Sequence, residues 1–385
     1  MKRTNFSHHA PGNVIQTLQG YLAFIPNPLP PDIHWSDKLL AALSQADRSL
    51  ARLAEVGKAF PVPHAVVRPF IRKEAVFSSQ IEGTQTTFQE LLSFEAGQLS
   101  LFRNLEDTQE VHNYVQALDY GLERLETLPL SLRLIREIHA QLMHGVRGES
   151  MTPGEFRRSQ NWIGRPGATL DKARFVPPPP DVMHDCLSDL EKFIHTDSEL
   201  PPLIKIGLIH YQFEAIHPFL DGNGRIGRLL ITFLLVAWGL LHQPLLNLSR
   251  FIETNRQEYY DHLLAVSQKG SWETWLLFFL EGVHSQAEDA AHRISRLSDL
   301  RSNYIAKISH DRSRKTLENL IDYLIGTPIT SISKADEALQ IGSFNKVQRN
   351  IKKLEALGIV REVTGNKRNR IYRADQIIHA LEARF

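Results

Sequence analysis

Apolar residues recur at steps of three and four along most of the chain, which is the spacing of an amphipathic α-helix. The pattern is clear in Leu39, Leu43, Leu50 and Leu53. The same spacing predicts helices over residues 39–56, 64–81, 104–125, 132–144, 182–194, 204–216, 225–238, 249–267 and 272–308. Because these segments fill most of the chain, the predicted fold class is mainly α.

Two segments interrupt the helical pattern. Residues 13–35 are rich in proline (PNPLPPDIHW) and predict an extended arm. Residues 151–180 contain several glycines and four consecutive prolines, with strand-like pieces over 160–163 and 174–176. This second segment predicts a short β-hairpin flap, with an ordinary proline-rich excursion as the alternative.

The pattern changes again after residue 314. Predicted helices over 317–324, 333–339 and 343–357 are followed by two alternating pieces, REVTG and NRIYRA, and the whole resembles a winged helix-turn-helix domain. Basic and polar residues occupy the candidate recognition helix and the wing: Lys346, Arg349, Asn350, Lys353, Lys367, Arg368 and Arg370. Such a domain would dock in a DNA major groove, or serve dimerisation or the docking of a target. The chain is thus divided into residues 1–103, 104–308 and 309–385.

Composition excludes several classes of protein. Of the 385 residues, 42% are hydrophobic and 23% are charged, which excludes a disordered, collagen-like or disulfide-stapled chain. The net charge of +1 hides an asymmetry, because residues 301–385 hold 16 Lys and Arg against 9 Asp and Glu, whereas the rest holds 28 against 34. A basic C-terminal part indicates an anionic partner such as DNA, or a solvated surface with surplus lysines.

The chain carries no sign of export or membrane insertion. Cys186 is the single cysteine, which fits a reducing compartment, and no apolar run follows the first basic residues. The longest apolar run, 229–241, is shorter than the roughly 20 residues that span a bilayer. We therefore expect a cytoplasmic protein without a membrane partner.

The sequence HPFLDGNGRIGR, residues 217–228, concentrates groups suited to phosphate chemistry. Gly222 and Gly224 let the backbone curl and point N–H groups at one spot, and the helix that follows offers a positive dipole end. Arg225 and Arg228 are expected to share a helix face and clamp phosphate oxygens. Asp221 is a hard oxygen ligand for Mg²⁺, and His217 at the loop entrance could accept a proton from a hydroxyl. An ordinary helix connection with surface arginines is the structural alternative.

A dinucleotide-binding fold is a poor fit to the same glycines. Gly222, Gly224 and Gly227 match GxGxxG, but that fingerprint needs a strand before it and an acidic residue about 20 positions later. Here a predicted helix precedes the glycines and a long apolar helix follows them. A Rossmann enzyme is therefore not expected.

This stretch resembles the signature HPFx[D/E]GNGRxxR of the Fic (filamentation induced by cAMP) family at every specified position. The resemblance also includes FRRSQNWIG before the flap, the pair Tyr259–Tyr260 and a helical N-terminal extension, and it covers roughly residues 14–300. It implies a Fic-type helical core over 104–308. Most members transfer AMP from ATP to a hydroxyl group of a target protein.

The resemblance also implies roles for individual residues. His217 would be the base for a target Ser, Thr or Tyr, and Asp221 would hold Mg²⁺ on the ATP phosphates. Phe219 would anchor the loop in the core. The anion site would be formed by the rest of the motif, that is by Gly222, Asn223, Gly224, Arg225, Gly227 and Arg228. Flap and adenine contacts would come from Ile163, Gly164, Tyr259 and Tyr260, although adjacent tyrosines are more often core residues.

An upstream segment, SSQIEG, resembles the Fic inhibitory motif [S/T]xxxE[G/N], with Ser78 first and Glu82 as its acidic member. By this resemblance Glu82 would reach Arg228 and take the guanidinium meant for the γ-phosphate. The structural alternative is a helix end with a solvated carboxylate.

Three readings of the function stay open on sequence alone. The first is a protein adenylyltransferase inhibited by Glu82, with self-modification and homodimerisation as further features of the family. The second is a DNA-binding regulator whose core senses a nucleotide, although intact His217 serves no purpose in binding alone. The third uses the same site to remove AMP or to transfer a phosphate.

Overall fold

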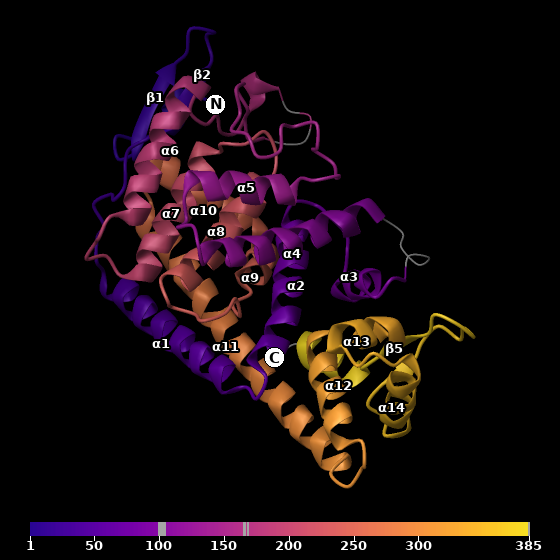
Figure 1. The fold of residues 1–385 in the computed structure, drawn as a ribbon. Helices are drawn as coiled ribbons and strands as arrows, with labels where there is room; N and C mark the ends of the chain where they lie inside the picture. The colour runs from indigo at the N-terminus through magenta and orange to yellow at the C-terminus, as the bar shows by residue number, and fades with distance from the viewer. Residues whose placement is uncertain (99–104, 165–166, 168, 384–385) are drawn as a thin grey trace.

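A computed structural model describes residues 1–98, 105–164, 167 and 169–383, and it is mainly helical, as predicted. The α-helices of the described part are α1 (Asp37–Ala59), α2 (Pro63–Ile81), α3 (Phe88–Glu95), α4 (Leu105–Leu125), α5 (Leu132–Leu142), α6 (Pro180–His195), α7 (Pro202–Ile216), α8 (Asn223–Ala237), α9 (Leu248–Thr254), α10 (Arg256–Lys269), α11 (Trp272–Lys307), α12 (Arg314–Gly326), α13 (Ile332–Leu339), α14 (Phe344–Ala356) and α15 (Asp375–Glu382). Figure 1 shows α7 and α8 inside the larger, upper part of the molecule.

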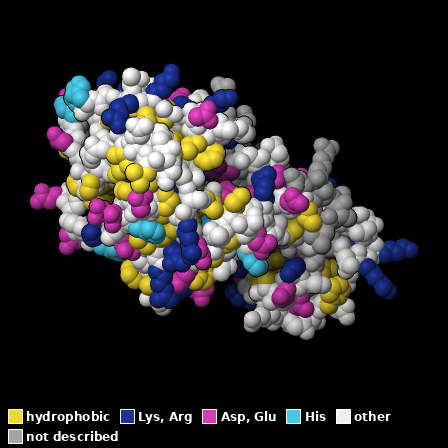
Figure 2. All heavy atoms as spheres, turned by 90° about the horizontal axis from the view of Figure 1, so that it is seen from above, with side chains coloured by type: hydrophobic (Ala, Val, Ile, Leu, Met, Phe, Trp, Pro, Cys, Tyr) yellow, Lys and Arg dark blue, Asp and Glu magenta, His cyan; other side chains and the backbone are white. Residues whose placement is uncertain are grey.

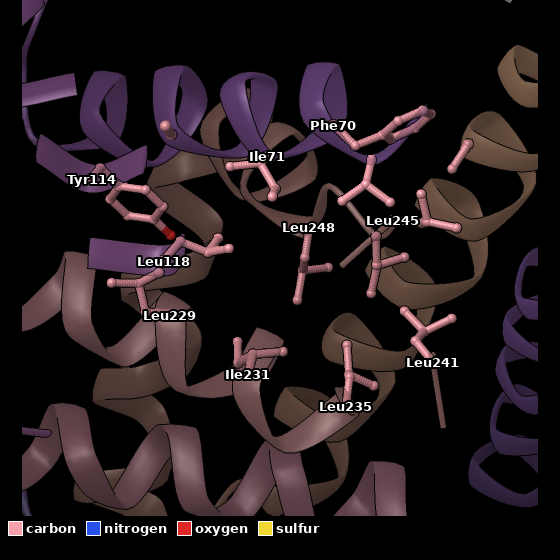
Figure 3. Packing of buried hydrophobic residues seen from close by; sticks show 14 of the residues in the cluster. Phe70, Ile71, Tyr114, Leu118, Leu229, Ile231, Leu235, Leu241, Leu245 and Leu248 are labelled. Atoms are coloured by element: carbon pink, nitrogen blue, oxygen red, sulfur yellow. The ribbon is translucent and has the colours of Figure 1, made fainter. Parts of the chain in front are cut away.

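Helix α7 is the centre of this part, because its residues 203–216 are buried on every side. Such a helix is apolar all round rather than amphipathic. Helix α8 packs on α7, and α2 and α4 cover α8 from the other side. Figure 3 shows the contact, where Ile71 of α2 and Leu118 of α4 point toward Leu229 and Ile231 of α8. The loop between α7 and α8 is thereby mounted on two rigid, buried helices.

Helix α11 connects the larger part to the C-terminal elements (Figure 1). With 36 residues it is about 54 Å long at 1.5 Å per residue. Helix α1 packs along it, while α12 and α15 pack on its C-terminal half and α12 also contacts α2. The helix that carries Ser78 therefore touches both the core and the C-terminal elements.

The proline-rich N-terminal segment is not simply extended. Strands β1 (Gly12–Gln16) and β2 (Leu22–Pro26) form an antiparallel hairpin with Gly12 opposite Pro26. Strand β2 buries Phe24 against Phe175, and the Phe24 N–H donates to the Val176 carbonyl at 2.9 Å. The predicted arm is thus corrected to a hairpin, because its few apolar residues gain burial by pairing beside the flap.

The flap is a looser structure than a regular hairpin. Its two predicted strands make a single antiparallel bridge, in which Ile163 and Phe175 exchange N–H···O bonds of 2.9 and 3.1 Å. The base of the flap is tied to α10 by an ion pair between Arg174 and Asp261.

One helix prediction needs correction, and two helices were missed. The segment 249–267 is two helices, α9 and α10, which separate at Asn255. Helices α3 and α15 were not predicted; each has eight residues and packs on elements distant in the sequence. The predicted boundary at 103/104, and the first residue of the helix predicted over 104–125, lie outside the described residues.

The C-terminal elements follow the predicted order of three helices and a hairpin. Strands β3 (Ile329–Ser331), β5 (Ile371–Arg373) and β4 (Arg361–Glu362) form an antiparallel sheet in the order β3-β5-β4. Opposite partners are Thr330 with Tyr372, and Glu362 with the same tyrosine. This is the element order that a winged helix-turn-helix requires, and that assignment stays a prediction. None of the helices in the described ranges is both long and apolar enough to span a bilayer.

Candidate active site

His217 ends the buried helix α7 in a left-handed backbone conformation, with φ of 50°. This conformation is uncommon for a residue other than glycine and needs support from its surroundings. The support comes from two side chains that donate to the His217 carbonyl, Arg157 Nε at 3.0 Å and Asn161 Nδ2 at 3.1 Å. The turn that presents the imidazole is therefore held from outside its own helix.

The tautomer of His217 follows from its hydrogen bond. Nδ1 lies 3.3 Å from the Glu214 carbonyl, which can only accept, so Nδ1 carries the proton and Nε2 keeps its lone pair. Burial, assisted by the charge of Arg157, lowers the pKa of His217 to about 4. The imidazole is thus neutral at pH 7 and able to take a proton from a hydroxyl.

The rest of the loop is fixed by its own side chains. Asn223 closes it with two bonds of 2.8 Å to Phe219, one accepted from the N–H and one donated to the carbonyl. Phe219 is fully buried and stacks on His139 with ring centroids 3.8 Å apart. Gly222 has φ of 79°, and a Cβ there would lie 3.0 Å from Met143 Sδ. Helix α8 then begins at Asn223 without a side-chain cap, which leaves its first N–H groups available to an anion.

Asp221 points a partly exposed carboxylate out of the loop. Its side chain is 46% exposed, and Oδ1 accepts the Gly222 N–H at 2.6 Å. Its carbonyl accepts from His139 Nε2 at 3.0 Å, because Nδ1 of that ring already accepts the Gly154 N–H at 2.8 Å. One fixed, solvent-facing carboxylate is a suitable ligand for Mg²⁺, which binds through one or two carboxylates together with substrate phosphates.

The two arginines of α8 point to different partners. Arg225 is buried and lies 3.4 Å from Glu110 and 3.7 Å from Asp221. Arg228 is also buried, and its side chain faces α2 instead. They line two sides of the α8 N-terminus and do not form a single clamp.

Ser78 and Glu82 engage Nε and Nη2 of Arg228 on the α2 side. Arg228 Nε donates to Ser78 Oγ at 2.8 Å, while Nη2 donates to the Ser78 carbonyl at 2.9 Å and to Glu82 Oε1 at 2.7 Å. Only 1% of the Arg228 side chain is exposed, against 35% of Glu82. Burial acts to raise the pKa of Glu82, but the charge of Arg228 outweighs it and holds that pKa below its usual value. The carboxylate therefore stays charged at neutral pH.

The Glu82 carboxylate also lies directly over the start of α8. A Cβ added to Gly224 would collide with Glu82 Oε1, so the two groups are in contact. The position where the sequence predicts phosphate oxygens is thus held by a carboxylate, which is another anion.

Comparison with known proteins identifies the family. Residues 129–235 match the Fic/DOC family, and residues 40–123 match its N-terminal region, described as Fic/DOC family N-terminal. The chain belongs to the Fic/DOC family. In this Fic/DOC chain the match over 129–235 contains the α7–α8 loop, and the match over 40–123 contains α2, the helix that ends at Glu82.

The relatives are distant. Protein adenylyltransferase Fic of Drosophila erecta is 26% identical over 219 residues, or 54% of this chain and 41% of that protein, and the Drosophila virilis protein is 27% identical over the same length. The chain thus spans 41% of the length of these curated relatives. A crystal structure of a Fic family protein from Desulfovibrio desulfuricans G20 has a TM-score of 0.61 at 18% identity, covering 90% of this chain and 98% of that one. That likeness supports the Fic fold.

Two predicted site residues of this Fic/DOC chain lie in the core instead. Gly227 faces α7, where a Cβ would collide with Glu214, and its carbonyl accepts from His210 Nδ1 at 3.0 Å. Tyr259 is 1% exposed, and its hydroxyl donates to Nε2 of the same histidine at 2.7 Å. Their roles are therefore corrected to helix packing, which leaves Tyr260, half-buried beside Arg256, as the tyrosine open to a ligand.

Several site residues were not singled out from the sequence. Arg157 and Asn161 both lie in FRRSQNWIG, so that stretch carried a signal for them. His139 and Glu110 sit on distant helices with nothing in their local pattern to mark them. Glu214, one turn before His217, has a buried oxygen without a hydrogen-bond partner, and burial raises its pKa to about 7.

Proposed function

We propose that this protein transfers AMP from ATP to a hydroxyl side chain of a target protein. The observation that carries the proposal is a neutral imidazole, with Nε2 free to accept, set at the mouth of an uncapped helix N-terminus. A base beside an anion site is the arrangement that nucleotidyl transfer to a hydroxyl requires. The family and the names of the curated relatives support the same activity.

In the proposed reaction, His217 Nε2 takes the proton from the target Ser, Thr or Tyr hydroxyl. The oxygen attacks the α-phosphorus of ATP, and the bond from that phosphorus to the bridging oxygen of the β-phosphate breaks. Pyrophosphate leaves and AMP stays on the target. The N–H groups of Asn223 and Gly224 at the start of α8 stabilise the α- and β-phosphates, while Gly222 shapes the turn and its N–H holds Asp221. Arg225 and Arg228 neutralise the outer phosphates.

Mg²⁺ would be held by Asp221, whose carboxylate is fixed by the Gly222 N–H and open to solvent. When bound, the ion neutralises charge on the α- and β-phosphates. Among the described residues no cluster of three metal-ligating side chains exists, so ATP oxygens and water would complete the coordination.

We further propose that Glu82 holds the site in an inhibited state. Nη2 of Arg228 donates one hydrogen to the Ser78 carbonyl and the other to Glu82, so this nitrogen has no hydrogen left for a γ-phosphate. The carboxylate against Gly224 also repels any phosphate that enters the same space. ATP would then bind, if at all, with its α-phosphate away from His217.

The adenine is expected to lie between Tyr260 and the flap. Tyr260 is half-buried, and Ile163 and Gly164 sit at the bridge of the flap. The exposed flap edge could pair with an extended target segment.

The test uses the Glu82→Gly protein with Mg²⁺ and ATP labelled in turn at the α- and γ-phosphorus. We expect covalent α-label, on a target in a cell extract or on the protein itself. Covalent γ-label would identify a kinase. Loss of AMP from a pre-labelled target would identify an enzyme that removes AMP by hydrolysis. Absence of covalent label from both nucleotides would overturn the proposed transfer.

Asn161→Ala should lower the rate of AMP transfer about tenfold, measured in the Glu82→Gly background. The variant loses its bonds to the His217 and Phe219 carbonyls, at 3.1 and 2.8 Å, but leaves Arg157 in place. A misplaced base affects kcat more than KM for ATP. Gln257→Ala, which removes a surface amide bonded to Asp261, is the matched control and should leave both constants unchanged.

A further inference from the structure

Exposed cations gather on one face of the C-terminal elements. Arg349 and Lys352 lie on the side of α14 opposite the buried Val347, and Lys346 is also exposed. Lys367 and Arg368 are exposed in the connection between β4 and β5. In Figure 2, Lys and Arg side chains project from the right-hand edge of the molecule, on the side where Figure 1 has these elements.

These cations are not neutralised by neighbouring acids. Within the part of the chain that the structure describes, none of Lys346, Arg349, Lys352, Lys367 and Arg368 forms an ion pair. Three acidic side chains nearby, Asp336, Glu355 and Glu362, accept backbone N–H groups and keep their charge, and Glu337 pairs with Lys334 at 3.6 Å. The five unpaired cations outnumber these three unpaired carboxylates. The face therefore presents a net positive charge to solvent.

Two residues predicted to read DNA are occupied elsewhere. Asn350 is fully buried and donates to the Lys346 carbonyl at 2.9 Å. Lys353 pairs with both oxygens of Asp311 at 2.7 and 2.8 Å, which fastens α14 to the α11–α12 connection. The available set is thus corrected to Lys346, Arg349 and Lys352.

A groove of about 790 Å³ lies between α14, the start of α13 and the β4–β5 connection, and residues 96–98 after α3 line it as well. Its lining includes the amides of Gln348 and Asn366, the cation of Arg370, and Phe344, which is 49% exposed. Lys334 and Glu337 also line it, and they pair with each other. Amides, guanidinium groups and apolar contacts are the chemistry that reads base edges.

We propose that this face binds duplex DNA, with α14 in the major groove and the β4–β5 connection on the flanking phosphates. Helix α14 has 13 residues, about 20 Å of length, and a helix of about 10–12 Å diameter fits a major groove of about 12 Å. Cations on both α14 and the connection would then reach phosphates on either side of the groove. This binding is separate from nucleotide transfer, since none of these residues lies near His217.

The test measures fluorescence anisotropy of a labelled 24-base-pair random-sequence DNA duplex with the full chain over a salt series. We expect binding that weakens steeply with salt. Arg349→Ala/Lys352→Ala should weaken it at least tenfold and reduce the salt slope by about two, since each lost phosphate contact removes about 0.9. Lys38→Ala/Lys58→Ala on α1 removes the same charge from another surface and should bind as the wild type does.

Three results would overturn the proposal. The first is no duplex binding at low salt by a folded protein. The second is equal weakening in the α1 control, which would reduce the effect to net charge. The third is binding of duplex RNA or of polyglutamate as tight as that of the DNA duplex, or tighter. The major groove of A-form RNA does not admit a helix, and polyglutamate has no groove, so either result would mean that the face recognises negative charge alone. Circular dichroism of each variant separates unfolding from lost binding.

Discussion

Glu82→Gly should raise AMP transfer about 10- to 150-fold over the wild type. The substitution frees Arg228 Nη2 from its 2.7 Å bond and removes the anion that touches Gly224. A hydrogen bond to a charged group contributes about 1.5–3 kcal/mol, and every 1.4 kcal/mol changes a rate about tenfold. The measurement is the initial rate of α-label transfer at saturating ATP and Mg²⁺.

The protein should still fold, because Ser78 continues to accept two bonds from Arg228, but the loss of the ion-pair partner of this buried guanidinium should lower the thermal stability. Glu82→Gln is the matched control: it keeps the side chain's size but loses the charge, so we expect activity between that of the wild type and the glycine variant. Equal rates in all three proteins would mean that the carboxylate does not restrain the site.

His217→Asn should lower AMP transfer by about 10²- to 10⁴-fold in the Glu82→Gly background, the usual contribution of a general base. Asparagine tolerates the left-handed backbone at this position, with φ of 50°, so the loop keeps its course. Its amide cannot take a proton from the target hydroxyl. The measurement is again the rate of α-label transfer, together with the affinity for ATP, which we expect to change little.

His139→Asn is a useful comparison for this variant. His139 stacks on Phe219 and supports the Asp221 carbonyl, but it is not placed to act as the base. We expect a smaller loss of rate and lower thermal stability. A His217→Asn protein that retained full activity would rule out His217 as the base and point to another acceptor, with Glu214 one turn away as the nearest candidate.

Helix α2, which carries the proposed inhibitory residues, is held by more than Arg228. Lys73 of this helix donates to the Leu381 carbonyl of α15 at 2.8 Å in a buried bond. Close to the other end of α2, a Cβ on Gly326 of α12 would lie only 2.9 Å from the Ala65 carbonyl. The C-terminal elements therefore pack against the helix that ends at Glu82.

Local patterns were sufficient for most of the long helices. Apolar spacing predicted α1, α2, α7, α8 and α11 to within a few residues, because each is long enough to repeat its pattern over several turns. The short α3 and α15 and the β1–β2 hairpin were missed, since their stability comes from packing against distant segments. The break at Asn255, between α9 and α10, was also missed.

By itself, the sequence determined the fold class, the family and the identity of the loop that carries His217 and Asp221. It could do so because adjacent residues in one motif express a chemistry that needs them at that spacing. Only the tertiary structure decided which side chains face the site. It directed Arg225 to Glu110 and Arg228 to Glu82, turned Gly227 and Tyr259 into the core, and brought Arg157 and Asn161 to the His217 carbonyl. These contacts join residues up to about 150 positions apart, so they depend on how the helices pack and no local pattern encodes them.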